Sequence, residues 1–322
     1  MKAIVQERYG RPQDVLTLGV IERPAIKDDE VLVRVRAAAV HIGDCHMIRG
    51  VPYLFRPVYG LRSPKTPVPG TDLAGTVETV GTAVTQLKPG DDVFGWGKGT
   101  FAEYARAKAD DLLPKPAGLT FEHAAAVGVS AFTALQALRD HGKVQPGQRV
   151  LINGASGGVG TFAVQIAKAF GAEVTAVCST RNVDLVRSIG ADHVVDYTRE
   201  DFTLGGPRYD LILDNVGNHS FADTRRALAP GGLLLSNGAP IDGWVGGLGH
   251  VLKAFVSSLF VRQQGRPFVS MNGPADHMAL RELVESGAIT PVIDRTVPLD
   301  EAVEAIVHVT QGHARGTTVI SV

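Results

Sequence analysis

Two histidines, an aspartate and a cysteine lie within six positions in the segment HIGDCH, residues 41–46. Imidazole, carboxylate and thiolate groups are ligands of transition metals, so this composition suggests a metal site. A catalytic zinc, however, needs three protein ligands that converge on one point. Six consecutive residues rarely supply them, so a site at His41, Asp44 and His46 would need a ligand from elsewhere in the chain. We therefore predict no metal.

The glycine-rich segment NGASGGVG, residues 153–160, is the second group of residues that could do chemistry. It follows the apolar run VLIN and precedes a helical stretch, after which comes a further strand, EVTAVC. Small residues in such a turn let backbone N–H groups approach a pyrophosphate at the helix N-terminus, where the helix dipole favours negative charge. Because the flanking elements have the required spacing, the segment predicts a dinucleotide site rather than a tight turn without a ligand.

The end of that further strand indicates which dinucleotide is bound. An NAD site usually has Asp or Glu there, which binds the 2′-hydroxyl of the ribose. This chain has Ser179, Thr180 and Arg181, whose hydroxyl and guanidinium groups donate hydrogen bonds and suit a 2′-phosphate. We therefore expect NADP(H) as the cofactor. The alternative is that Arg181 only pairs with Asp184 on the following helix.

Two kinds of segment position these motifs. Up to about residue 122, short strands are separated by glycine and proline turns, which predicts a mostly β domain. Over residues 123–287, continuous apolar runs alternate with helices, which is typical of a doubly wound parallel sheet covered on both faces. The tail, residues 288–322, has a helix and an alternating strand that suit the first domain. We predict an α/β protein whose chain returns to its first domain.

Composition argues against several classes of function. The formal net charge is −1 and we find no basic stripe, so we expect no nucleic-acid partner. Only two cysteines and an N-terminus without an apolar signal region predict a cytoplasmic location. The apolar stretch 243–261 is almost as long as a membrane span, but it contains four glycines, His250 and Lys253. We expect a packed loop and helix there and no integral membrane segment; peripheral membrane contact is the alternative.

Several longer motifs carry a family resemblance over essentially the whole chain. They are PGTDLAGTVETVG at 69–81, LKPGDDVFG at 87–95, VSAFTALQAL at 129–138, INGASGGVGTFAVQIAKAFGA at 152–172, STRNVDLVRSIGAD at 179–192 and the terminal ARGTTVISV. Together they resemble the medium-chain dehydrogenase/reductase superfamily, within it the zinc-independent quinone oxidoreductase branch. The resemblance implies a GroES-like, mostly β catalytic domain over 1–122, completed by 288–322, and a Rossmann cofactor domain over 123–287.

The resemblance also implies a set of cofactor contacts. The residues at matching positions are Ser156, Gly157, Gly158 and Val159 for the pyrophosphate, Ser179, Arg181 and Tyr197 for the 2′-phosphate, and Thr133, Asn215, Val216, Gly238 and Ala239 for the nicotinamide half. Tyr197 could instead be an ordinary aromatic at a strand end. The chain departs from the family at Thr317, where a lysine is common, and this puts any lysine contact there in doubt.

Zinc-containing relatives hold three ligands at places where this chain has His41, Thr71 and Ala126. Two of the three are therefore not ligands. His41 stands where the quinone branch commonly has asparagine, close to the nicotinamide, and could donate a hydrogen bond or a proton to a substrate carbonyl. Tyr53 could bind or stack on a flat acceptor, as could Tyr59; each could equally be a rim aromatic.

These features predict an NADPH-dependent, metal-independent reductase that transfers hydride to a quinone or an α,β-unsaturated carbonyl. The alternatives are a zinc-type alcohol dehydrogenase and a non-catalytic NADPH-binding or sensor protein. A homodimer is expected from the resemblance, and because the stretch RPFVSMN, residues 266–272, could pair across a two-fold axis. Pro267 limits that pairing.

Overall fold

The computed structural model describes residues 1–238, 264–268, 274–312 and 314–322. The chain forms two compact units: Met1–Ser130 with Asn272–Arg281 and Pro291–Val322, and Ala131–Met271 with Glu282–Thr290. The domain limits at residues 122 and 288 stay a prediction. The stretch 243–261, for which we predicted a loop and helix, lies outside the described residues.

The described part of the first unit contains a small and a large sheet. In the small one, β1 (Lys2–Gln6) pairs antiparallel with β2 (Leu16–Val20). The large one has the order β14-β15-β3-β4-β5-β7, with β6 paired to β3. Its strands are β3 (Glu30–Val40), β4 (Asp72–Val80), β5 (Asp92–Trp96), β6 (Tyr104–Lys108), β7 (Leu112–Pro114), β14 (Ile293–Pro298) and β15 (Thr317–Ser321).

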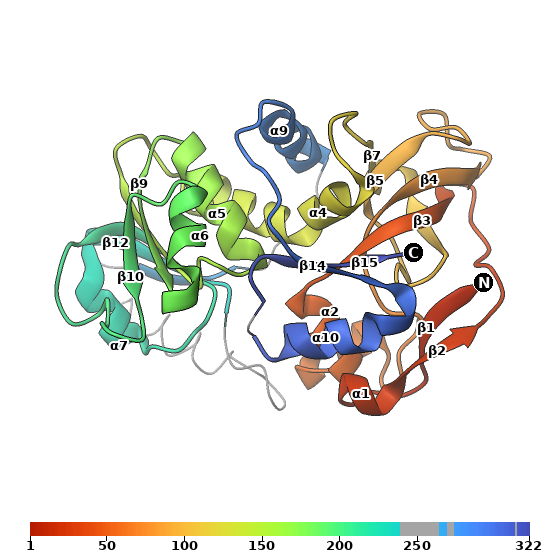
Figure 1. Ribbon diagram of the computed structural model, residues 1–322, viewed down its shortest axis with the longest axis horizontal. Coiled ribbons are helices and arrows are strands. Elements are labelled where there is room, and N and C mark those ends of the chain that lie inside the picture. The colour runs from red at the N-terminus through yellow and green to blue at the C-terminus, as the bar shows by residue number, and fades with distance from the viewer. Residues whose placement is uncertain (239–263, 269–273, 313) are drawn as a thin grey trace. The chain divides into compact units, whose positions relative to one another are not determined.

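Strand β3 is buried along nearly its whole length, with only Arg34 and Arg36 exposed. The apolar face that it and its neighbours bury forms the core of the unit, together with Ile48, Phe101 and Ile306. Helix α10 packs beside this sheet and against α1 and α2 (Figure 1). The helices of this unit are α1 (Pro12–Val15), α2 (Ile42–Arg49), α3 (Arg56–Tyr59) and α10 (Ala302–Thr310), with short 3₁₀ turns η1 (Tyr53–Phe55), η2 (Ala109–Asp111) and η6 (Leu299–Glu301).

The predicted return of the chain is visible in the strand order. Strand β15 lies between β14 and β3, parallel to the first and antiparallel to the second (Figure 1). Its residues Val319 and Ile320 are fully buried. Two longer helices contribute to both units: α4 (Phe121–Gln136), which has a non-helical residue at Gly128, and α9 (Pro274–Glu285).

The second unit is built on a parallel sheet of six strands in the order β10-β9-β8-β11-β12-β13. The runs that we interpreted as buried strands are buried: Val150, Leu151 and Ile152 have no exposed surface. Its strands are β8 (Arg149–Asn153), β9 (Glu173–Cys178), β10 (His193–Asp196), β11 (Tyr209–Asp214), β12 (Leu228–Ser236) and β13 (Gln264–Pro267). Its helices are α5 (Gly158–Ala169), α6 (Val183–Ser188) and α7 (Phe221–Thr224), with the turns η3 (Ala137–His141, π), η4 (Thr180–Asn182) and η5 (Arg225–Ala227).

The strand order reverses direction between β8 and β11. In parallel sheets of this kind, ligands bind outside the carboxyl ends of the strands at such a reversal. The glycine-rich turn follows β8, so it lies at the place in the sheet where a ligand is expected. At the far edge, β13 takes up Arg266 and Pro267 of the stretch predicted to pair across a two-fold axis. Among the described residues, no helix has both the length and the apolar character needed to cross a membrane.

Candidate cofactor and active site

The glycine-rich turn connects β8 to α5 in a conformation that requires small residues. Gly154 has φ +76°, in the left-handed region that glycine adopts without a steric cost. A Cβ atom on Gly160 would lie 2.1 Å from the carbonyl oxygen of Gly154, so only glycine allows this close approach. Ala155 donates a backbone hydrogen bond to Val177 at 3.0 Å, which ties the turn to β9.

Gly157 is different, because none of the described residues occupies the place of a side chain there. Among them, a Cβ atom on Gly157 would meet only the Gly154 carbonyl oxygen, at 3.6 Å. Gly157 precedes the first residue of α5, whose first N–H groups have no partner within the helix. The turn thus offers open space and N–H donors at a positive helix end, and this arrangement fits a pyrophosphate.

The predicted 2′-phosphate residues lie at the ends of β9 and β10. Ser179 is half-buried, Arg181 is exposed and the Tyr197 side chain is 59% exposed. The Tyr197 backbone donates to the Cys178 carbonyl at 3.0 Å, so the two strand ends lie side by side. These positions leave donor side chains at the carboxyl end of the sheet.

A carboxylate in the same place, that of Asp196, could not be predicted from the strand that follows the glycine-rich turn, because Asp196 ends β10 rather than β9. It lies opposite Cys178 in the strand register. The Thr180 hydroxyl donates to it at 2.6 Å and lowers its pKa, as does a 2.8 Å hydrogen bond from the Thr198 hydroxyl. Arg199 forms an ion pair with it at 3.5 Å. These hydrogen bonds keep the Asp196 carboxylate ionised and use its oxygens, and the Arg199 guanidinium is the cation that faces its charge.

Asn182 is a second residue that sequence analysis missed. Its side chain is 4% exposed, and its amide nitrogen donates to the hydroxyl oxygens of Ser156 at 2.8 Å and Ser179 at 3.3 Å. It thus connects the glycine-rich turn with the end of β9. The two contacts span 26 residues and 3 residues of sequence, and the longer one gives no local signal in the sequence.

The residues predicted for the nicotinamide half follow β11 and β12. The backbone N–H of Asn215 donates to the Asn153 carbonyl at 3.2 Å, and that of Gly238 donates to the Asp214 carbonyl at 3.0 Å. The carboxylate of Asp214 accepts hydrogen bonds from the backbone of Val216 at 3.0 Å and from the Asn153 amide at 2.9 Å.

The carboxyl ends of β8, β11 and β12 are therefore fixed to one another. Thr133, on α4, is buried. Ala239 lies outside the described residues.

In the first unit, His41 belongs to a compact polar cluster at the end of β3. Its Nε2 atom lies 2.7 Å from the Thr71 hydroxyl and 3.3 Å from the Asp44 carboxylate. The Asp44 carboxylate also accepts the His41 backbone N–H at 3.1 Å and the Thr71 hydroxyl at 3.3 Å. Burial raises the pKa of Asp44, and the neighbouring His41 lowers it. Asp44 thus fixes the start of α2 and the ring of His41.

The other side of the His41 ring lies over the first turn of α2. A Cβ atom on Gly43 would be 2.8 Å from Nδ1. The His41 side chain also accepts the backbone N–H of Asp44 in a capping box. The ring is therefore held between the Thr71 hydroxyl and the start of α2.

Asp72, beside Thr71, is a buried acid that sequence analysis also missed. It is 2% exposed, and both of its oxygens accept the Val129 N–H, at 3.1 and 3.0 Å. Burial raises the pKa of Asp72 to about 7, against the charge of His41 and the Val129 hydrogen bond, which lower it. A Cβ atom on Gly128 would lie 2.2 Å from this carboxyl group, so glycine is required there.

Tyr53 lies in η1 and is 36% exposed. The Arg56 guanidinium stacks 4.4 Å from the centre of its ring and 4.8 Å from the ring of Tyr9. The cation therefore occupies one aromatic face, which leaves less of the ring for a flat acceptor. Tyr59, in α3, is 38% exposed.

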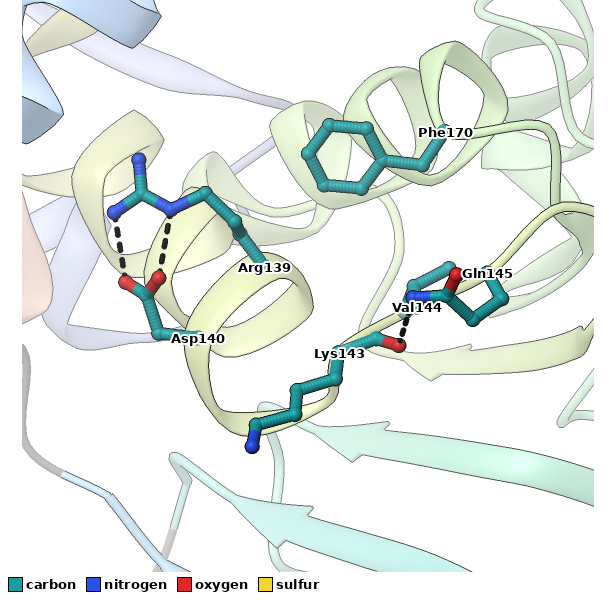
Figure 2. Close-up of a pocket in the computed structure, with 6 residues that line it drawn as sticks. All are labelled: Arg139, Asp140, Lys143, Val144, Gln145 and Phe170. Carbon is teal, nitrogen blue, oxygen red and sulfur yellow. Dashed lines mark hydrogen bonds and ion pairs between the residues drawn. The ribbon is translucent and has the colours of Figure 1, made fainter.

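A cavity of about 550 Å³ lies elsewhere in the second unit, between η3 with the loop after it and the end of α5 (Figure 2). Figure 2 shows the Arg139 guanidinium facing the Asp140 carboxylate, at 2.7 and 2.8 Å, so these two charges neutralise each other. None of the predicted cofactor residues lines it.

The places of the three zinc ligands in zinc-containing relatives hold His41, Thr71 and a buried Ala126. Within the described ranges there is no group of three or more His, Cys, Asp or Glu side chains that could hold a metal ion.

Known proteins resemble both halves of the chain. Residues 27–117 match the family model of the alcohol dehydrogenase GroES-like domain, and residues 189–320 match that of the zinc-binding dehydrogenase. The mitochondrial NAD(P)H oxidoreductase RTN4IP1 of Mus musculus is 35% identical, over 100% of this chain and 89% of its own. The chloroplastic quinone-oxidoreductase homolog of Spinacia oleracea is 32% identical, over 99% of this chain and 98% of its own.

Among solved structures, the quinone oxidoreductase from Coxiella burnetii superposes with a TM-score of 0.88 at 29% identity, over 100% of this chain and 99% of that one. This likeness and the matched domains confirm the predicted fold class, a GroES-like β domain with a Rossmann parallel sheet. They also confirm the resemblance seen in the sequence motifs. The chain belongs to the medium-chain dehydrogenase/reductase superfamily, in its quinone oxidoreductase-like branch.

Proposed function

We propose that this chain is an NADPH-dependent reductase that acts without a metal and reduces a quinone or an α,β-unsaturated carbonyl. The observation that carries the proposal is the cluster of His41, Thr71 and Asp44. At the place where zinc relatives bind their metal, it presents hydrogen-bonding groups instead. An acceptor that is activated by its own conjugation does not need a metal to polarise it.

The cofactor residues fit NADP(H) by their chemistry. The open space at Gly157 and the start of α5 suit the pyrophosphate. Ser179, Arg181 and Tyr197 offer donors for a 2′-phosphate, and the nearby carboxylate of Asp196 already has partners. For the nicotinamide half we propose Thr133, Asn215, Val216, Gly238 and Ala239.

When bound, the nicotinamide supplies a hydride from its C4 carbon to the conjugated system of the acceptor. The protein meets the negative charge that then develops on the acceptor oxygen. We assign this role to His41, whose imidazole would donate to that oxygen and deliver the proton that completes the reduction, while Asp44 and Thr71 hold the ring in place. Tyr53 would contact the acceptor at its edge.

The decisive experiment follows the oxidation of NADPH, and of NADH in parallel, by enzyme treated with a chelator. The acceptors are ortho- and para-quinones and enones. We expect turnover that prefers NADPH. Recovery of alcohol oxidation on adding zinc would instead support a zinc alcohol dehydrogenase, and tight NADPH binding without any turnover would support a binding or sensor protein.

The choice of cofactor has its own test. Arg181→Ala should lower the preference for NADPH over NADH about tenfold or more, because a charge-assisted hydrogen bond to the 2′-phosphate is lost. Arg187→Ala, on the exposed side of α6, is the matched control and should leave the ratio unchanged. An unchanged ratio in Arg181→Ala would refute the assignment of Arg181. The homodimer and the cytoplasmic location stay predictions; the relatives reported above are mitochondrial and chloroplastic.

A further inference from the structure

We propose that Asn182 is a positioning residue for the cofactor. Its amide turns the hydroxyl groups of Ser156 and Ser179 so that both donate to phosphate oxygens of NADP(H). The inference deepens the proposed function and rests on it. Asn182, Ser156 and Ser179 all belong to the second unit.

The contacts of Asn182 fix the direction of each hydrogen bond. Its amide nitrogen donates to the Ser156 oxygen at 2.8 Å and to the Ser179 oxygen at 3.3 Å. An amide nitrogen can only donate, so both serine oxygens act as acceptors in these contacts. Each serine therefore keeps its own O–H hydrogen for another partner.

Within the described residues, neither serine hydroxyl has an acceptor for that hydrogen. Ser156 lies in the glycine-rich turn, and Ser179 follows β9. Phosphate oxygens only accept hydrogen bonds, so two hydroxyls that are held as donors match a pyrophosphate and a 2′-phosphate. Without Asn182, each hydroxyl could rotate and donate to another protein group. The two hydroxyls would then no longer be held as donors for phosphate oxygens.

A second observation points to a ligand at the same place. The amide oxygen of Asn182 is buried and has no hydrogen-bond donor in the described structure. Buried polar atoms nearly always have a partner, so a donor is expected there from beyond the described residues, and a bound ligand can supply it. A ribose hydroxyl has the hydrogen that this oxygen needs. The one side chain would thus orient two phosphate donors and accept from the sugar between them.

The test measures binding rather than turnover, by calorimetry with NADPH and with 2′,5′-ADP. Asn182→Leu should raise the dissociation constant of NADPH about tenfold or more, because the hydrogen bonds from the two serine hydroxyls to charged phosphate groups would be weakened or lost. Asn182→Asp should weaken binding further. Its carboxylate can only accept, so it would draw both serine hydroxyls inward, and its charge would repel phosphate.

A double-mutant cycle shows whether Asn182 acts through the serines. In the Ser156→Ala, Ser179→Ala background, Asn182→Leu should change the dissociation constant by less than about threefold. Gln165→Met is the stability control. Gln165 is also buried and bonds the Thr161 and Thr290 carbonyls at 3.0 Å, so its loss should lower the melting temperature without changing binding.

The possible results separate the two proposals. If the unmodified protein binds neither NADPH nor 2′,5′-ADP, the proposed function fails. If it binds them and Asn182→Leu binds equally well, or loses the same factor in both backgrounds, Asn182 is no positioning residue. Should Asn182→Leu not fold, the near-isosteric Asn182→Asp decides: unchanged NADPH affinity would overturn the inference.

Discussion

Replacing Asp72 by asparagine is expected to change how stability depends on pH. Burial raises the pKa of this carboxyl group from 3.8 to about 7 in the folded protein. In the unfolded chain it should titrate near its ordinary value, about 3.9. Between these values the folded state keeps a proton that the unfolded state has released. The free energy of unfolding therefore falls as the pH rises from about 4 to about 7, and it changes no further above that range.

The size of the effect follows from the same two pKa values. The difference between 3.8 and about 7 corresponds to about 4 kcal/mol, at about 1.4 kcal/mol for each pKa unit. Asparagine keeps an oxygen that can accept the Val129 N–H, but it cannot ionise. Through this carboxyl group, the variant should gain only about 1 kcal/mol over the original protein at pH 4.5 and about 4 kcal/mol at pH 8.

Urea unfolding at pH 4.5, 6 and 8 would measure this difference, followed by tryptophan fluorescence because Trp96 lies in β5 of the same unit. Asp192→Asn is the contrasting control. Burial raises the pKa of Asp192, but hydrogen bonds from Lys168 and the Val174 backbone outweigh it and lower the pKa overall. Its contribution should therefore disappear as the pH falls. A stability difference for Asp72→Asn that is the same at pH 4.5 and pH 8 would refute the reasoning.

Two further predictions concern the cofactor turn and the polar cluster. Gly157→Ala should fold normally but bind NADPH at least about tenfold more weakly in calorimetry, because the new methyl group enters the open space. Gly160→Ala should instead lower the free energy of unfolding by about 1–3 kcal/mol, because its Cβ atom clashes with the backbone. Equal losses of stability in the two variants would contradict this account. Thr71→Val removes the hydroxyl that lies 2.7 Å from His41 Nε2. The variant should lower kcat with a quinone about tenfold without changing the dissociation constant of NADPH. A changed NADPH affinity with a normal kcat would contradict the role given to this cluster.

Local patterns predicted the elements that contain the cofactor turn. The run VLIN, the glycines after it and EVTAVC all appear as expected, because each depends on a short stretch of chain. The helix over Phe121–Gln136 is less regular than the local sequence suggests: it is interrupted at Gly128 and changes to a π-helix at Ala137. The interruption follows from the Asp72 carboxyl group packed against Gly128, 56 residues away, which periodicity cannot reveal.

The same reason explains which site residues were missed. Asp72 and Asn182 are defined by contacts with distant segments, and in the sequence they are an ordinary acid in a strand and an ordinary amide before a helix. His41 was identified, since an unusual composition surrounds it. Its partner Thr71, 30 residues away, was noted only as the place of a lost ligand.

The place of β15 in the large sheet has a consequence for how the protein is made. The strands of the parallel sheet all lie between Arg149 and Pro267. The large sheet of the first unit is complete only when Thr317–Ser321 has been synthesised, because this strand lies between β14 and β3. On a ribosome, the domain that emerges first would therefore be the last to complete its sheet. Before β15 is synthesised, β3 would expose an unpaired edge. Such an edge can pair with the wrong strand, so the nascent chain would have to be protected from aggregation there.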